Sequence, residues 1–374
     1  MSEHLFLRTT IALVWDFDTT LIPGYMQEPL FRCFDVDGGR FWKEANALSQ
    51  FYRERGVTRA SKDTLYLNHI LSYVRAGRFA GLNNRMLREL GREIEFYPGL
   101  PDYFPKIKER IANNPDFAKH QINVEHYIVS TGIREMIMGS RIASYVDDVW
   151  GCEFAEASAE PGYLEKSQSL FEQGAGVICE VAYSLDNTSK TRAIFEINKG
   201  CNKMSEIDVN ATIAQDIRRV PFQNMVYIAD GPSDVPCFSL VSHFGGRTYA
   251  VYKAKSDREF QKSYDLQKQQ RVEAFGEADY SDGSHTAMWI SKAVEDIAER
   301  IVRDRTRMLG DELGQPPGHV VEQPKAVSVE QSISAQRVMP ELLEVADDSS
   351  VPKKASGVAR IVKIKDDKPG AVTS

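Results

Sequence analysis

Four aspartates stand directly after two apolar runs of this chain. Asp16 and Asp18 follow one run, and Asp230 and Asp234 follow another. Residues two apart on an extended strand point to the same side, so Asp16 and Asp18 are expected to face a common ligand. Like charges held together cost free energy unless a cation shares their site. Carboxylate oxygens suit Mg²⁺, so the two motifs predict a magnesium site with a phosphate ligand.

Strands and helices must bring these acidic motifs together. Strands are expected at residues 10–15, 127–129, 177–182, 225–229 and 247–252, with helical patterns between them. Runs this apolar are typical of parallel strands buried on both faces. The alternation predicts an α/β fold with a Rossmann-like, mainly parallel sheet and helices on both faces. Such sheets bind ligands at the carboxyl ends of their strands, where the acidic motifs stand.

The segment between the first two strands is longer than a crossover requires. A parallel crossover needs about a dozen residues, and this one carries apolar residues at helical spacing over a much longer stretch. Helices are expected over residues 41–55 and 61–75. We therefore expect a helical cap over residues 25–97, inserted into a core that comprises residues 1–24 and 98–304.

Length, composition and net charge exclude several classes of protein. The chain has 374 residues, 42% hydrophobic and 26% charged, which suffices for a buried core. Residues 305–374 shift toward Pro, Ser, Val and mixed charge and predict a disordered tail. The net charge of -7 argues against nucleic-acid binding, and five scattered cysteines argue against disulfides or a zinc knuckle. With no secretion signal and no membrane-length apolar run, we expect a cytoplasmic protein.

Four motifs, in this order, resemble those of the haloacid dehalogenase (HAD) superfamily of phosphohydrolases. They are DxDxT at residues 16–20, a strand-end serine at Ser130, a helix-leading lysine at Lys190, and DxxxD at residues 230–234. One such motif is weak, but four in order on the expected elements are specific. The resemblance covers about residues 10–300 and implies phosphate chemistry with Mg²⁺ as the cofactor.

The resemblance gives each aspartate a role. It implies that Asp16 is the nucleophile that forms an aspartyl-phosphate, and that Asp18 transfers protons to and from the reacting oxygens. Mg²⁺ would be held by the carboxylates of Asp16 and Asp230 and by the backbone carbonyl of Asp18. Asp234 would support the metal through hydrogen bonds or a bound water.

The same resemblance implies a set of phosphate-binding residues. Ser130 would hydrogen-bond the transferring phosphoryl group, with Thr131 as an alternative donor and Gly132 in the same segment. Thr20 would steady the loop after the nucleophile. Ser130 has a second interpretation, as a helix cap before Gly132.

The phosphate-binding lysine is expected at Lys190. Residues 187–189 can cap a helix that runs from Lys190 through residue 197, which places this lysine in the first helical turn. Lys199 and Lys203 lie close by in the sequence and remain alternatives.

The position of the cap resembles that of the phosphoserine phosphatase subgroup. Members of this subgroup carry an acidic residue nine positions after the nucleophile, where this chain has Tyr25, with Glu28 close by. We place Tyr25 among the substrate-binding residues. Asp18 supplies the proton donor that phosphate chemistry needs and carbon–halogen cleavage does not. The expected activity is therefore hydrolysis of a small soluble phosphate ester.

Two alternatives stay open. A phosphotransferase or phosphomutase of the same fold would pass the phosphoryl group to a substrate hydroxyl instead of water. A protein of a different class would keep the HAD fold without catalysis and act on a partner through its tail. The intact set of acidic residues favours an enzyme.

Overall fold

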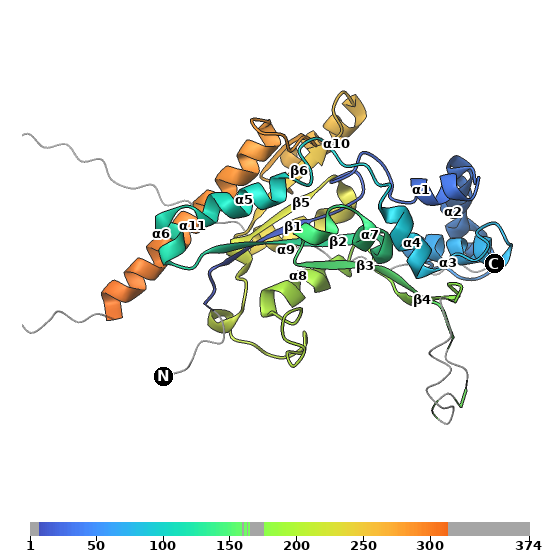
Figure 1. The fold of residues 1–374 in the computed structure, drawn as a ribbon, viewed down its shortest axis with the longest axis horizontal. Helices are drawn as coiled ribbons and strands as arrows, with labels where there is room; N and C mark the ends of the chain where they lie inside the picture. The colour runs from blue at the N-terminus through green and yellow to red at the C-terminus, as the bar shows by residue number, and fades with distance from the viewer. Residues whose placement is uncertain (1–6, 159–160, 163, 165–175, 313–374) are drawn as a thin grey trace, which may run out of the picture. The chain divides into compact units, whose positions relative to one another are not determined.

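A single mainly parallel sheet organises the chain (Figure 1). The computed structural model describes residues 7–158, 161–162, 164 and 176–312. The strands in these ranges are β1 (Thr10–Trp15), β2 (Asn123–Ile133), β3 (Asp148–Ala155), β4 (Glu180–Tyr183), β5 (Met225–Ala229), β6 (Arg247–Tyr252) and β7 (Ala274–Glu277). Their order is β4-β3-β2-β1-β5-β6-β7. Every neighbouring pair is parallel except β3 and β4.

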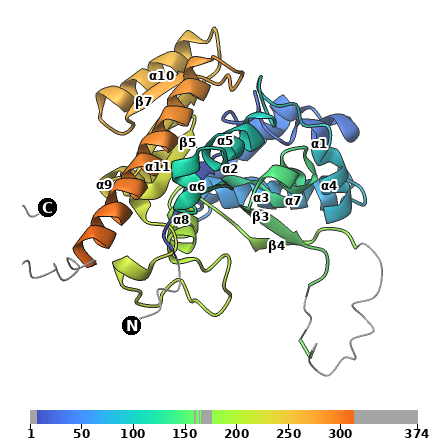
Figure 2. The same cartoon turned by 60° about the vertical axis from the view of Figure 1, so that its left-hand side comes forward.

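Helices cover both faces of the sheet. They are α1 (Glu28–Cys33), α2 (Gly38–Arg53), α3 (Lys62–Arg75), α4 (Asn84–Gly91), α5 (Tyr103–Ala112), α6 (Pro115–Lys119), α7 (Arg134–Gly139), α8 (Lys190–Lys199), α9 (Val235–His243), α10 (Asp257–Lys268) and α11 (His285–Glu312). Helices α5, α6 and α11 lie side by side, and α8 and α9 contact each other and the sheet on the other side (Figure 1 and Figure 2). The predicted α/β class with helices on both faces is confirmed.

Strand β1 lies at the centre of the sheet because all six of its side chains are buried between the two helical layers. The chain proceeds from β1 through β2 to one side and later through β5, β6 and β7 to the other. The gap between β1 and β5 is therefore the point where strand order reverses. Trp15 pairs with Ile228, so the residues that follow both strands emerge at the same edge.

The expected strands at residues 10–15, 225–229 and 247–252 are confirmed as β1, β5 and β6. The expected strand at residues 127–129 is the middle of the longer β2. The one at residues 177–182 was misplaced, because β4 begins at residue 180 and runs antiparallel at the sheet edge with its side chains alternately exposed. Strands β3 and β7 escaped prediction because glycines and acidic residues interrupt their apolar pattern.

The insertion between β1 and β2 is helical, as predicted, and contains α1 to α4. The expected helices at residues 41–55 and 61–75 correspond to α2 and α3. Helix α2 begins earlier, at residue 38, because the Asp37 side chain accepts a hydrogen bond from the backbone N–H of Arg40 and caps it.

Helix α4 of the insertion packs very closely on α7 of the core. A Cβ added at Gly91 would lie 2.1 Å from the Met136 carbonyl oxygen, and one added at Gly139 would lie 1.8 Å from the Arg88 carbonyl oxygen. Glycine at both positions lets the two backbones touch. The Arg88 guanidinium also donates to Glu135 at 2.7 Å. This contact anchors the C-terminal end of the insertion to the core.

Helix α11 continues beyond the expected start of the tail. The predicted boundary at residue 305 is wrong, since the helix runs to residue 312. The reason is tertiary: Ile301 is buried against the core, and Arg305 donates to the Leu7 carbonyl oxygen at 3.2 Å. The rest of the expected tail, residues 313–374, lies outside the described residues. Among the described helices, none is both long enough and apolar enough to cross a bilayer.

A histidine forms two hydrogen bonds inside the protein core. His126, in β2, is fully buried. Its Nδ1 accepts a hydrogen bond from the Trp15 indole at 3.2 Å, and its Nε2 donates to the Phe104 carbonyl oxygen at 3.2 Å. This pairing requires the neutral imidazole. Burial, together with the nearby charge of Lys108, lowers the pKa of His126 to about 3.

Acid is therefore expected to destabilise the fold through His126. The unfolded chain binds a proton there near pH 6.5, whereas the folded chain does so near pH 3. The stability that the neutral ring contributes is fully present above about pH 6.5 and is lost below it, by about 1.4 kcal/mol per pH unit. Denaturant unfolding at a series of pH values checks this. His126→Gln, whose amide donates and accepts without titrating, should lose less stability between neutral and acidic pH, and equal slopes for the two proteins would contradict the prediction.

Candidate active site

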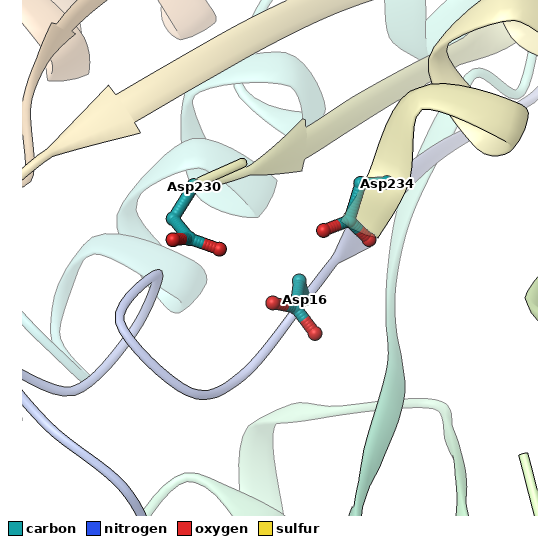
Figure 3. Close-up of side chains that lie close together, drawn as sticks. All are labelled: Asp16, Asp230 and Asp234. Carbon is teal, nitrogen blue, oxygen red and sulfur yellow. The ribbon is translucent and has the colours of Figure 1, made fainter. Parts of the chain in front are cut away.

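Three of the predicted aspartates come together at the edge where β1 and β5 end. Asp16 follows β1, Asp230 follows β5, and Asp234 lies in the turn that leads into α9. Each offers a carboxylate oxygen within 4.8 Å of the oxygens of the other two (Figure 3). The backbone N–H of Asp16 donates to the Ile228 carbonyl oxygen at 2.9 Å, which ties Asp16 to β5. Two segments more than 200 residues apart in the sequence thus form one acidic site.

Lys190 is the cation inside this site. Its ammonium donates to Asp16 Oδ1 at 2.8 Å and to Asp234 Oδ1 at 2.7 Å, and the residue is only 1% exposed. The alternative lysines are engaged elsewhere: Lys199 donates to backbone carbonyls of the loop after α8, and Lys203 lies over the Tyr127 ring. Lys190 is therefore the lysine that the fold brings to the acidic motifs.

The start of α8 positions Lys190, although a different residue from those expected stabilises it. No side chain of residues 187–189 caps the helix in the usual way. Instead the Asp186 carboxylate accepts from the backbone N–H groups of Thr188 at 2.9 Å and Ser189 at 2.6 Å. The Ser189 hydroxyl accepts in turn from the Asp186 N–H. An aspartate three positions before Ser189 was the sequence signal for this turn.

The electrostatics of the site follow from burial. Burial raises the pKa of Asp16 to about 7, with Lys190 opposing the shift and the charges of Asp234 and Asp230 adding to it. Burial by itself favours neutral Lys190, but the two carboxylates in contact with it outweigh this effect and raise its pKa. The lysine therefore stays charged and holds the two acids in place.

Asp18 stands apart from the three-carboxylate cluster. Its Oδ1 accepts a hydrogen bond from the backbone N–H of Met26 at 2.9 Å, which holds the carboxyl group at the start of the helical insertion. Thr19 takes a left-handed conformation, with φ of 56°, and turns the chain between the two positions. Burial, and then the charge of Asp16, raise the pKa of Asp18 well above its usual value. A protonated carboxyl group can donate a proton.

The predicted phosphate-binding segment lies at the end of β2. Ser130 is buried, and its hydroxyl accepts from the Gly132 N–H at 3.0 Å. It does not cap a helix, because β2 continues to residue 133 and α7 starts after it. The Thr131 carbonyl accepts from the Tyr66 hydroxyl of α3 at 2.6 Å. A Cβ at Gly132 would lie 2.0 Å from the end of the Met26 side chain, so a larger residue would require this side chain to move.

Thr20 and Tyr25 follow Asp16 in the segment that leads into the insertion. The Thr20 hydroxyl is 3.5 Å from Asp16 Oδ2, and its carbonyl accepts from the Tyr280 hydroxyl at 2.7 Å. Thr20 is fully buried. Tyr25 is 52% exposed, and its ring centroid lies 5.3 Å from that of Trp42 in α2.

Three further residues contact the acids and escaped sequence prediction. The Tyr227 hydroxyl donates to Asp234 Oδ1 at 2.7 Å, and the Ser233 hydroxyl donates to Asp234 Oδ2 at 2.8 Å. Ser233 lies within the second acidic motif and Tyr227 lies three residues before it, in β5, so closeness to that motif was a usable signal. The Lys262 ammonium, from α10, donates to Asp230 Oδ2 at 2.9 Å. The sequence around Lys262 contains no motif that would predict its contact with Asp230.

The donor set fits a magnesium ion. The converging atoms are carboxylate oxygens, the hard ligands that Mg²⁺ takes, and no softer ligand belongs to the cluster within the described ranges. The three clustered aspartates and their partners Lys190 and Lys262 carry a formal charge of -1. One divalent cation would make the site net positive and so favour an anionic phosphate ligand.

Sequence comparison relates the chain to a bacterial protein. No protein-family model matches it. An uncharacterized protein of Borreliella burgdorferi is 40% identical over 287 residues, which make up 76% of this chain and 96% of that protein. The aligned length therefore spans nearly the whole relative.

Comparison of structures finds more distant resemblances. A HAD family hydrolase from Salmonella enterica serovar Typhi is 12% identical with a TM-score of 0.40, and the match covers 71% of this chain and 66% of that one. A phosphoserine phosphatase in its apo form is 12% identical with a TM-score of 0.39, covering 71% and 92%. A dehalogenase is 12% identical with a TM-score of 0.33, covering 75% and 96%. Identity this low carries no activity from those proteins to this chain.

Proposed function

This chain belongs to the same family as the Borreliella burgdorferi relative, and we propose that it is a Mg²⁺-dependent phosphatase of the HAD type that hydrolyses a small phosphate monoester. One observation carries the proposal. Asp16, Asp230 and Asp234 converge around the buried Lys190 at the carboxyl ends of β1 and β5. A group of repelling carboxylates around a buried lysine is costly for folding, whereas in phosphoryl transfer the carboxylates hold a metal ion and the lysine contacts the phosphate.

Mg²⁺ would be held by the carboxylates of Asp16 and Asp230 and by the backbone carbonyl of Asp18. Asp234 supports this set, because its three donors (Lys190, Tyr227 and Ser233) hold its carboxylate in one orientation. When bound, the metal offsets the repulsion between an anionic phosphate and the acidic side chains.

Asp16 and Asp18 carry the chemistry in two steps. In the first, an Asp16 carboxylate oxygen bonds to phosphorus, the ester P–O bond breaks, and the Asp18 carboxyl gives its proton to the leaving alkoxide. In the second, the Asp18 carboxylate takes a proton from a water molecule whose oxygen bonds to phosphorus. The bond from phosphorus to Asp16 then breaks, releasing inorganic phosphate. The raised pKa of Asp18 favours the protonated form that the first step needs.

Lys190, Ser130 and the backbone of Gly132 stabilise the charge that develops on the phosphoryl oxygens, with Thr131 as the alternative to Ser130. Lys190 is well placed for this, since it already contacts the nucleophile. Preorganised donors in a buried site contribute strongly because no solvent has to reorganise as the charge develops.

The helical insertion, residues 25–97, acts as the cap in this proposal. Tyr66 bonds to the Thr131 carbonyl and Met26 bonds to Asp18, so helix α3 and the start of the insertion both contact the catalytic edge. A cap here would exclude water from the aspartyl-phosphate and present Tyr25 to the substrate. The substrate is a small soluble ester, no nucleic acid or membrane takes part, and a cytoplasmic location remains a prediction.

Metal-dependent phosphate release tests the function. With Mg²⁺, the purified full chain is expected to release phosphate from p-nitrophenyl phosphate, and EDTA should stop the release until Mg²⁺ is restored. A panel of metabolite phosphates then identifies the preferred ester. Faster transfer to an added alcohol than to water would indicate a phosphotransferase. Failure to cleave any ester of the panel would refute the proposal and favour a binding protein.

A further inference from the structure

A second lysine reaches the acidic site from α10. The Lys262 ammonium lies 2.9 Å from Asp230 Oδ2, and the two side chains are 34% and 14% exposed. Lys190, by contrast, is fully buried and held by two carboxylates. Lys262 therefore stands at the rim of the site with a single acidic partner.

The Lys262 side chain packs against the backbone at Gly231. A Cβ built on Gly231 would lie 3.0 Å from the Lys262 ammonium and 3.3 Å from its last methylene carbon. The lysine side chain thus lies across Gly231, directly after Asp230. A Cβ in that place would require the end of the lysine side chain to shift by a few tenths of an ångström.

Another polar group lies near this rim without a partner. The Tyr97 hydroxyl is buried and has no hydrogen-bond partner among the described residues. Burial raises its pKa, with the charges of Glu259, on α10, and Asp230 adding to the effect, so the hydroxyl lies in their electrostatic field. A buried hydroxyl left unpaired costs free energy.

The partner of Lys262, Asp230, is also a proposed ligand of the metal ion. A cation bound to Asp230 neutralises the carboxylate that now holds the ammonium, and the flexible lysine stem is free to turn. An incoming phosphate would bring new negative charge, which a nearby lysine ammonium can stabilise. Among the described residues, Lys262 would then be a positive charge at the site that is released from its carboxylate partner.

We propose that Lys262 is an anion-binding residue of this site, which pairs with Asp230 while the metal is absent and holds the phosphate ligand once the metal occupies Asp230. This inference rests on the proposed function. Lys262 lies outside the four sequence motifs. It would strengthen phosphate binding and weaken Mg²⁺ binding.

Two binding measurements on the full chain test it, with Mg²⁺ alone and with inorganic phosphate in saturating Mg²⁺. Lys262→Met should bind Mg²⁺ about two- to fivefold more tightly, because a partly exposed ammonium no longer competes for Asp230. It should bind phosphate about ten- to a hundredfold more weakly, because a charge-assisted hydrogen bond is lost. Lys262→Arg should restore most of the phosphate affinity, and Lys268→Met, an exposed change on the same helix, should alter neither value.

The outcomes separate the two proposals. Wild-type Mg²⁺ and phosphate affinities in Lys262→Met, whether or not the melting temperature changes, would show that the contact plays no part in ligand binding and overturn the inference alone. Wild-type protein that binds no Mg²⁺ would overturn the metal site and the inference together. Weaker Mg²⁺ binding in Lys262→Met would also contradict the inference, because a competing cation can only reduce metal affinity.

Discussion

Asp16→Asn is expected to abolish phosphate release while leaving the fold intact. The amide is nearly the same size as the carboxylate but is a far weaker nucleophile, so the rate should fall by about 10⁴-fold or more. Asp234 continues to hold Lys190, which keeps the buried ammonium paired. Phosphate release from p-nitrophenyl phosphate measures the rate, and circular dichroism confirms folding.

A trapping experiment sharpens this prediction. Acid quenching with labelled substrate should leave phosphate on the wild-type protein and none on Asp16→Asn, because only the carboxylate forms the acyl phosphate bond. Asp282→Asn is the matched control, since it alters only an exposed pair with Lys106. Label on Asp16→Asn, or undiminished turnover, would rule out Asp16 as the nucleophile.

Lys190→Met is expected to damage both stability and activity. The ammonium is 1% exposed and separates two buried carboxylates, so its loss leaves negative charges facing each other without a partner. Breaking a buried pair in this way costs about 3–5 kcal/mol of unfolding free energy. Loss of a phosphoryl-stabilising donor lowers the rate by about 10²–10³-fold. Denaturant unfolding in EDTA and steady-state kinetics in Mg²⁺ measure the two effects separately.

Magnesium distinguishes this electrostatic cost from a packing defect. Added Mg²⁺ should restore part of the lost stability of Lys190→Met, because a bound cation replaces the missing positive charge. Lys199→Met is the control on the same helix: its ammonium bonds only to loop carbonyls, so the variant should lose less than about 2 kcal/mol and keep its rate. Stability and activity of Lys190→Met equal to those of wild type would remove Lys190 from the site.

The central elements could be predicted because local sequence dictates them. Strands β1 and β5 are continuous apolar runs, and buried parallel strands need apolar side chains on both faces. The edge strands β4 and β7 could not, because half-exposed strands of four residues carry too little pattern. The end of α11 was misjudged for a related reason: Ile301 and Arg305 find their partners elsewhere in the fold.

On its own, the sequence indicated which side chains could bind a metal and phosphate. Acidic pairs that follow apolar strands, and a lysine at the start of a helix, can be identified from the neighbouring residues alone. Tertiary structure decided which of them meet. It selected Lys190 over Lys199 and Lys203, left the Asp18 carboxyl on Met26 instead of in the carboxylate cluster, and brought Lys262 to Asp230. The physical reason is that Coulombic and hydrogen-bond energies depend on distance in space, and only the packing of α8 and α10 on the sheet sets those distances.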